Sequence, residues 1–198
     1  MNESEIIDIE QKYMANFFAK RPVTAVRGQG ALLWDAAGNE YLDCMSAYGV
    51  SLVGHCHPRV VKAIQQQSEL LIACHSSLYN DARSTFLKKL MAITPPSLKK
   101  VFLANSGTEA VETAIKLARR FTGKPGIVAF IGGFHGKTMG SLSATWKSKY
   151  RTPFEPLVPG FVHVPYGKID SLRTVIDEKT AAIIVEPIQG ENGVKVPP

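Results

Sequence analysis

The stretch NSGTE, residues 105–109, combines two hydroxyl side chains and a glycine directly after the apolar run VFLA, 101–104. The run is typical of a short buried strand, and residues 109–121 repeat apolar side chains at helical spacing. Small hydroxylated residues at a helix start can bind an anion such as a phosphate, because the first N–H groups have no helical partner. The same residues can simply cap the helix, with Ser106 and Glu109 as a capping box. This stretch alone leaves both interpretations open.

Two other glycine-rich segments also follow apolar runs. GGFHGKT (132–138) comes after 126–131, and EPIQGENG (186–193) comes after 181–185. Ligands bind where the carboxyl ends of parallel strands meet, so we expect the three segments to lie together. GGFHGKT also suggests the phosphate-binding loop of nucleotide hydrolases. Ile131, however, stands where that loop needs its first glycine, so the sequence disfavours this class of enzyme.

The segment GHCHP, 54–58, with Cys74 and His75 further along the chain, suggests a metal site. Neighbouring residues of an extended segment point to opposite sides, and the sequence holds no CxxC or HxxxH pair. We therefore expect no metal. A tight turn that enters a helix at Pro58 is the simpler interpretation.

The spacing of apolar residues predicts a helix and a β-hairpin, then two helices, and then alternating strands and helices. Such alternation is typical of an α/β fold with a mainly parallel sheet flanked by helices. The predicted helices cover 3–18, 58–73, 81–93, 109–121 and 169–178, and the predicted strands cover 31–34, 40–44, 101–104, 126–131, 161–164 and 181–185.

The composition is that of an ordinary globular protein. The 198 residues are 45% apolar and 20% charged, and no stretch approaches the ~20 apolar residues of a membrane span. The acidic N-terminus is not a signal peptide, and three cysteines fit a reducing compartment, so we expect a cytoplasmic protein. The net charge of +6 comes from scattered Lys and Arg residues, which disfavours nucleic acid as a partner and leaves an acidic partner open.

Several motifs in order resemble the class III (subgroup II) pyridoxal 5′-phosphate (PLP) aminotransferases. They are RGQGALLWDAAGNEYLDC, GHCHPRVVKAI, NSGTEAVETAIKLAR, GGFHGKTMGSLSAT and IIVEPIQGENGV. Within the family, the sequence is most similar to acetylornithine and lysine-biosynthesis aminotransferases, including those acting on a semialdehyde linked to a carrier protein. The resemblance implies PLP-dependent transferase fold type I, which is aspartate aminotransferase-like. Residues 1–50 would form an N-terminal helix and hairpin segment of the small domain, and 51–198 an incomplete large PLP-binding domain.

The resemblance also implies roles for individual residues. Gly107 and Thr108, with help from Ser106, would hold the cofactor phosphate. Phe134 would stack on the pyridine ring, and Glu186 would lie near that ring.

Three further residues match positions on the substrate side. Lys137 stands where the family usually has the arginine that grips the substrate α-carboxylate, so a point charge would replace a bidentate clamp. Glu191 would pair with a substrate-gating arginine far downstream. Tyr48 falls near the position that shapes the substrate side-chain pocket, although a core aromatic is an equal alternative.

The family's catalytic residues have no counterpart in this sequence. The Schiff-base lysine and the aspartate that pairs with the pyridine nitrogen both lie downstream of EPIQGE in the family. The resemblance thus implies the N-terminal portion of a longer enzyme, a homodimer when complete. That enzyme would transfer an amino group between glutamate and an ω-semialdehyde. The alternative is a non-catalytic binding or dimerising module of the same fold.

Overall fold

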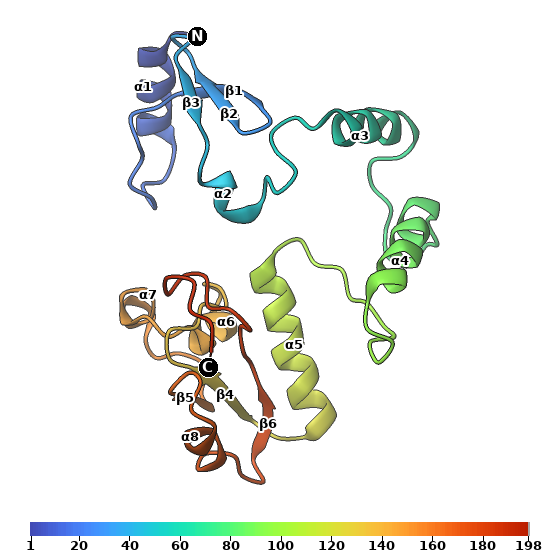
Figure 1. The fold of residues 1–198 in the computed structure, drawn as a ribbon, viewed down its shortest axis with the longest axis vertical. Coiled ribbons are helices and arrows are strands. Elements are labelled where there is room, and N and C mark those ends of the chain that lie inside the picture. Colours follow the sequence, from blue (N-terminus) through green and yellow to red (C-terminus); the bar gives the residue numbers. More distant parts are fainter. Residues whose placement is uncertain (198) are drawn as a thin grey trace. The chain divides into compact units, whose positions relative to one another are not determined.

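The computed structural model describes residues 1–197 and divides into two compact units, Met1–Phe86 and a second that begins at Leu87. Figure 1 shows the order of the elements along the chain. Among residues 1–197, no helix combines the length and apolarity needed to cross a bilayer.

The first unit contains a small antiparallel sheet of three strands in the order β1-β2-β3. Strands β2 and β3 form the predicted hairpin, whereas β1 was not predicted because its sequence, AVRGQ, lacks an apolar alternation. The elements are α1 (Glu3–Tyr13), β1 (Ala25–Gln29), β2 (Leu32–Asp35), β3 (Glu40–Leu42), α2 (Ser46–Gly49) and α3 (Pro58–Leu70), and α4 (Asp81–Ile93) crosses into the second unit.

The hairpin turn is organised by Asp35. Its carboxylate accepts hydrogen bonds from the N–H groups of Ala37 and Asn39 at 3.0 and 2.8 Å. The hydroxyl of Tyr41 donates to the same carboxylate at 2.8 Å. Gly38 has a φ of 87°, which glycine adopts without steric cost. The turn residues therefore fix the register of β2 against β3.

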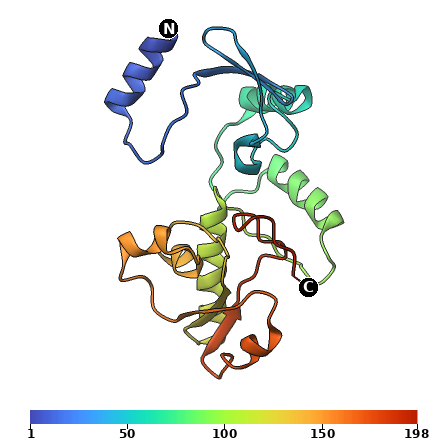
Figure 2. The same ribbon diagram turned by 60° about the vertical axis from the view of Figure 1, so that its left-hand side comes forward.

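The second unit is built on a parallel sheet in the order β5-β4-β6, which confirms the predicted mainly parallel α/β fold. Among residues 1–197, all buried hydrophobic residues belong to this unit, and they lie on β4, α6, the end of β5 and, with Ile115, on α5. In the turned view, α5 stays beside β6 (Figure 2). The elements are α5 (Gly107–Thr122), β4 (Gly126–Phe130), α6 (Met139–Ala144), α7 (Ser148–Arg151), a 3-10 turn (Thr152–Phe154), β5 (Phe161–Val164), α8 (Ile169–Arg173) and β6 (Thr180–Ile183).

The predicted strand 101–104 is wrong. Within residues 1–197, the central strand β4 has β5 on one side and β6 on the other. Residues 101–104 pair with neither of these two edge strands. An apolar run becomes a strand only where another strand offers hydrogen bonds. Phe102 is 68% exposed, so this run is not buried in the described chain either. Helices α1, α3 and α8 also end earlier than their apolar patterns predict.

Candidate functional site

The start of α5 carries the first predicted site residues. Ser106 is the N-cap, and its hydroxyl accepts from the N–H of Glu109 at 3.3 Å. The Glu109 carboxylate accepts from the N–H of Asn105 at 2.7 Å rather than from Ser106, so only half of the predicted capping box forms. Within residues 1–197, the N–H groups of Gly107 and Thr108 have no acceptor, and a Cβ added at Gly107 would meet nothing within 4 Å. The helix therefore presents two open donors.

The Thr108 side chain joins α5 to the GGFHGKT segment. Its hydroxyl lies 2.7 Å from the hydroxyl of Thr138 and 2.6 Å from that of Ser141. A Cβ added at Gly136 would overlap the oxygens of Thr108 and Ser141, and Gly136 also has a φ of 129°. Only glycine lets this loop approach Thr108 so closely. The structure thus brings together two of the three segments that the sequence analysis grouped.

Glu112 completes this cluster and was not predicted. Its Oε1 accepts from the hydroxyl of Thr138 at 2.6 Å and from the N–H groups of Gly140 and Ser141 at 2.8 and 3.0 Å. Burial raises the pKa of Glu112, but these hydrogen bonds outweigh it and hold the pKa below its usual value. The sequence did hold a signal, because Glu112 lies four residues after Thr108 and so faces the same side of the helix.

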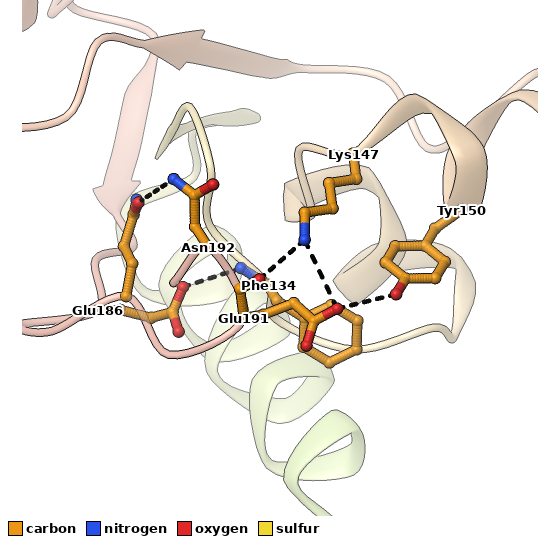
Figure 3. Close-up of polar contacts among 7 residues, drawn as sticks. Phe134, Lys147, Tyr150, Glu186, Glu191 and Asn192 are labelled. Carbon is orange, nitrogen blue, oxygen red and sulfur yellow. Dashed lines mark hydrogen bonds and ion pairs between the residues drawn. The ribbon is translucent and has the colours of Figure 1, made fainter. Parts of the chain in front are cut away.

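The third predicted segment meets the second at Phe134. The Phe134 N–H donates to Oε2 of Glu186 at 2.8 Å, which ties the loop after β4 to the loop after β6. The Phe134 ring meets the Tyr150 ring edge-on, with centroids 5.7 Å apart and planes at 73°. Figure 3 shows Phe134 between Glu186 on one side and Tyr150 on the other. Two partners from distant parts of the chain thus fix this aromatic residue.

Glu191 is held by two residues that sequence analysis missed. The hydroxyl of Tyr150 donates to Oε1 of Glu191 at 2.9 Å (Figure 3). Lys147 donates to the backbone carbonyl of Glu191 at 2.8 Å, and its Nζ lies 3.7 Å from the same Oε1. Neither Lys147 nor Tyr150 belongs to a recognisable sequence motif, and each contacts a residue more than 40 positions away in the sequence. Both are half-buried.

Lys137 projects near the same aromatic residue. Its Nζ lies 5.1 Å from the centroid of the Tyr150 ring, and the Nζ of Lys149 lies 4.7 Å from it. Tyr150 therefore contacts Phe134 and has positive charge beside its ring.

Residues 13–198 match the family described as aminotransferase class-III. The chain belongs to this aminotransferase family. It is 53% identical over its whole length to the acetylornithine aminotransferase of Methanopyrus kandleri, of which it covers 50%. It is 45% identical to the [LysW]-aminoadipate semialdehyde transaminase of Deinococcus radiodurans over 98% of this chain and 46% of that protein. The chain thus spans about half the length of the curated relatives it matches.

The fold is likewise that of class-III aminotransferases, PLP fold type I. The taurine:2-oxoglutarate aminotransferase of Bifidobacterium kashiwanohense, solved in complex with PLP and glutamate, superposes with a TM-score of 0.91 and is 26% identical. The match covers all of this chain and 51% of that one.

The class-III aminotransferase resemblance assigned Tyr48 to the substrate pocket, and this role stays a prediction. Tyr48 belongs to the first unit, where the residue is 87% exposed and its φ is 57°. It is therefore not the core aromatic of the alternative. His55, from the segment considered as a metal site, instead lies 2.7 Å from the carboxylate of Asp43.

One buried and one half-buried imidazole of this aminotransferase chain, those of His135 and His163, predict a pH dependence of stability. Burial lowers the pKa of His135, and the nearby charge of Glu186 opposes this only partly. Burial also lowers the pKa of His163, whose ring lies 3.0 Å from the carbonyl oxygen of Ala144. A lowered pKa means that the unfolded chain binds protons first. The contribution of the two neutral imidazoles to the free energy of unfolding should therefore be fully present above the ordinary histidine pKa. It should be lost as the pH falls toward the lowered pKa values of the folded state.

The measurement is urea unfolding of the wild type and His135→Gln between about pH 7.5 and pH 5. The wild type should lose free energy of unfolding across this range, and the variant should lose less, because it lacks one of the two groups. His75→Gln, which removes an exposed imidazole, is the matched control. If the free energy of unfolding fell equally with pH in His135→Gln and in the wild type, His135 would not contribute to the pH dependence of stability.

Proposed function

We propose that this chain is the cofactor-binding portion of a PLP-dependent transaminase that moves an amino group between glutamate and an ω-semialdehyde. The observation that carries the proposal is the pair of open N–H donors at Gly107 and Thr108, at the start of a 16-residue helix. The names of the relatives support two acceptor classes, an acetylated ornithine-type semialdehyde and an aminoadipate semialdehyde linked to the carrier LysW.

The donor set fits a phosphate group. The start of a helix carries about half a positive charge, and the N–H groups of Gly107 and Thr108 can donate hydrogen bonds to phosphate oxygens there. The space around Gly107 is open to such a group. When bound, PLP supplies the electron sink that makes amino-group transfer possible. We assign the phosphate to Gly107 and Thr108, with Ser106 as the helix cap.

The remaining site residues bind and orient. Phe134 is fixed at its N–H by Glu186, so its ring can offer a flat apolar face to a cofactor ring. Lys137 offers a positive charge to a substrate carboxylate. Glu191 presents a carboxylate whose position is set by Tyr150 and Lys147.

The Lys137 role predicts a selective kinetic effect. In the longer enzyme that contains this chain, Lys137→Ala should raise KM for glutamate about tenfold and leave the affinity for PLP unchanged, because it removes a substrate contact and no phosphate donor. Lys149→Ala is the matched control, since it removes an equal charge beside the same Tyr150 ring. An equal rise of KM in both variants would indicate a general charge effect and overturn the direct contact.

The acceptor can be identified by assay of the longer enzyme with free and carrier-linked semialdehydes. We expect an acidic amino-group carrier protein, because the chain has a net charge of +6. The rate at which the longer enzyme uses the carrier-linked substrate should then fall steeply with added salt. Preference for a free acetylated substrate with no salt dependence would favour the acetylornithine type. The three free cysteines support a reducing compartment, and dimerisation stays a prediction.

A further inference from the structure

Glu112 makes three hydrogen bonds through one oxygen. Its Oε1 accepts from the hydroxyl of Thr138 and from the N–H groups of Gly140 and Ser141, all within 3.0 Å. The two N–H groups belong to the first turn of α6. Glu112 therefore ties α5 to α6 at the point where the hydroxyl of Thr108 meets those of Thr138 and Ser141.

The chain makes room for this carboxylate. A Cβ added at Gly140 would overlap Oε2 of Glu112 and lie 3.0 Å from its Cδ. Gly140 lies inside a helix and has no positive φ, so its missing side chain gives space to the Glu112 carboxylate rather than conformational freedom to the backbone. Residues 140–144 of α6 are buried, with Ser141 and Ala144 fully inaccessible. The contact therefore joins α5 to a rigid part of the core.

Glu112 also restricts how the hydroxyl protons can be arranged. An ionised carboxylate only accepts, so the proton of Thr138 points to Glu112. The Thr138 oxygen is then free to accept, and the hydroxyls of Thr108 and Ser141 are within 2.7 and 3.0 Å of it. The Thr108 side chain is thus linked to Glu112 through Thr138, and its oxygen also lies 2.6 Å from the Ser141 hydroxyl and accepts from the N–H of Thr138 at 3.4 Å.

We propose that Glu112 is a positioning residue for the phosphate: through Thr138 it fixes the Thr108 side chain, and so aims the N–H groups of Gly107 and Thr108. This inference rests on the proposed function, which places the phosphate at these two groups. Glu112 itself does not touch the phosphate. Its contribution is to hold the first turn of α5 in one orientation, so that the two donors converge before the ligand arrives.

The single accepting oxygen gives a sharp test. The amide carbonyl of Glu112→Gln can accept the same three bonds, whereas Glu112→Ala removes them. The readout is the ratio of affinities for pyridoxine 5′-phosphate and pyridoxine, measured by isothermal titration of the 198-residue chain. Glu112→Ala should lower this ratio at least about tenfold, and Glu112→Gln should stay within about threefold of the wild type. A loss of packing alone would weaken both ligands and leave the ratio unchanged.

Thr138→Val provides a second variant if Glu112→Ala does not fold, because it removes the hydroxyl that links Glu112 to Thr108 and leaves the bonds from the N–H groups of Gly140 and Ser141 to Glu112 in place. It should lower the ratio as Glu112→Ala does. A wild-type preference for the phosphate ligand that survives Glu112→Ala or Thr138→Val overturns the positioning role and leaves the proposed function standing. A wild-type chain with no preference overturns the proposed function and this inference with it.

Discussion

Gly136→Ala is expected to be strongly destabilising, with a loss of about 2–5 kcal/mol in the free energy of unfolding. Two costs add. The φ of 129° is strained for alanine, and the new Cβ would overlap the hydroxyl oxygens of Thr108 and Ser141. The loop must then move away from α5, so affinity for a phosphate ligand should fall as well. Urea unfolding and titration with pyridoxine 5′-phosphate measure the two effects.

Gly107→Ala is the matched control for stability. Its Cβ would meet nothing within 4 Å, and Gly107 has no positive φ, so its change should stay below about 1 kcal/mol. If Gly136→Ala were no more destabilising than Gly107→Ala, the close approach of the loop to Thr108 would be incorrect.

Gln189→Leu is expected to have the second largest effect, a loss of about 2–4 kcal/mol. Gln189 is 1% exposed, and its amide donates to the carbonyl of Ile131 and accepts from Asn192, each at 3.0 Å. Leucine has a similar size but leaves both groups without this partner. The loop that carries Glu186 would then lose its tie to the end of β4.

Thermal and urea unfolding of Gln189→Leu should therefore show a clear loss of stability. The N–H of Phe134 should also become less protected against hydrogen exchange. Gln66→Leu makes the same change at an exposed position and should alter stability by less than about 0.5 kcal/mol. Similar stability of the two variants would contradict the role given to Gln189.

The sequence predicted the parts of the fold that depend on local pattern. Helix α4 and strand β5 have the predicted bounds, and the parallel sheet follows from the alternation of strands and helices. The strand at 101–104 failed because apolar composition does not say whether a partner strand is present. Phe121 is the last apolar residue of the repeat predicted over 109–121, and it is 88% exposed for a related reason, since the periodicity of a helix does not show what covers its apolar face.

The candidate site was predicted in part. The three glycine-rich segments were expected together, and the contacts of Thr108 with Thr138 and of Phe134 with Glu186 do join them. The supporting residues Glu112, Lys147 and Tyr150 were missed, because their roles depend on contacts that only the folded chain creates. The functional roles of the predicted residues remain proposals, and the Lys137 variant and the ligand titrations test those of Lys137, Gly107 and Thr108.

The most direct test of the central claim is titration of the wild-type chain with pyridoxine 5′-phosphate and with pyridoxine, neither of which has an aldehyde to react with lysine. Two N–H donors and the start of α5 should make the phosphate ligand bind at least about tenfold more tightly, a difference of about 1.4 kcal/mol. Equal dissociation constants for the two ligands would contradict a phosphate site at Gly107 and Thr108.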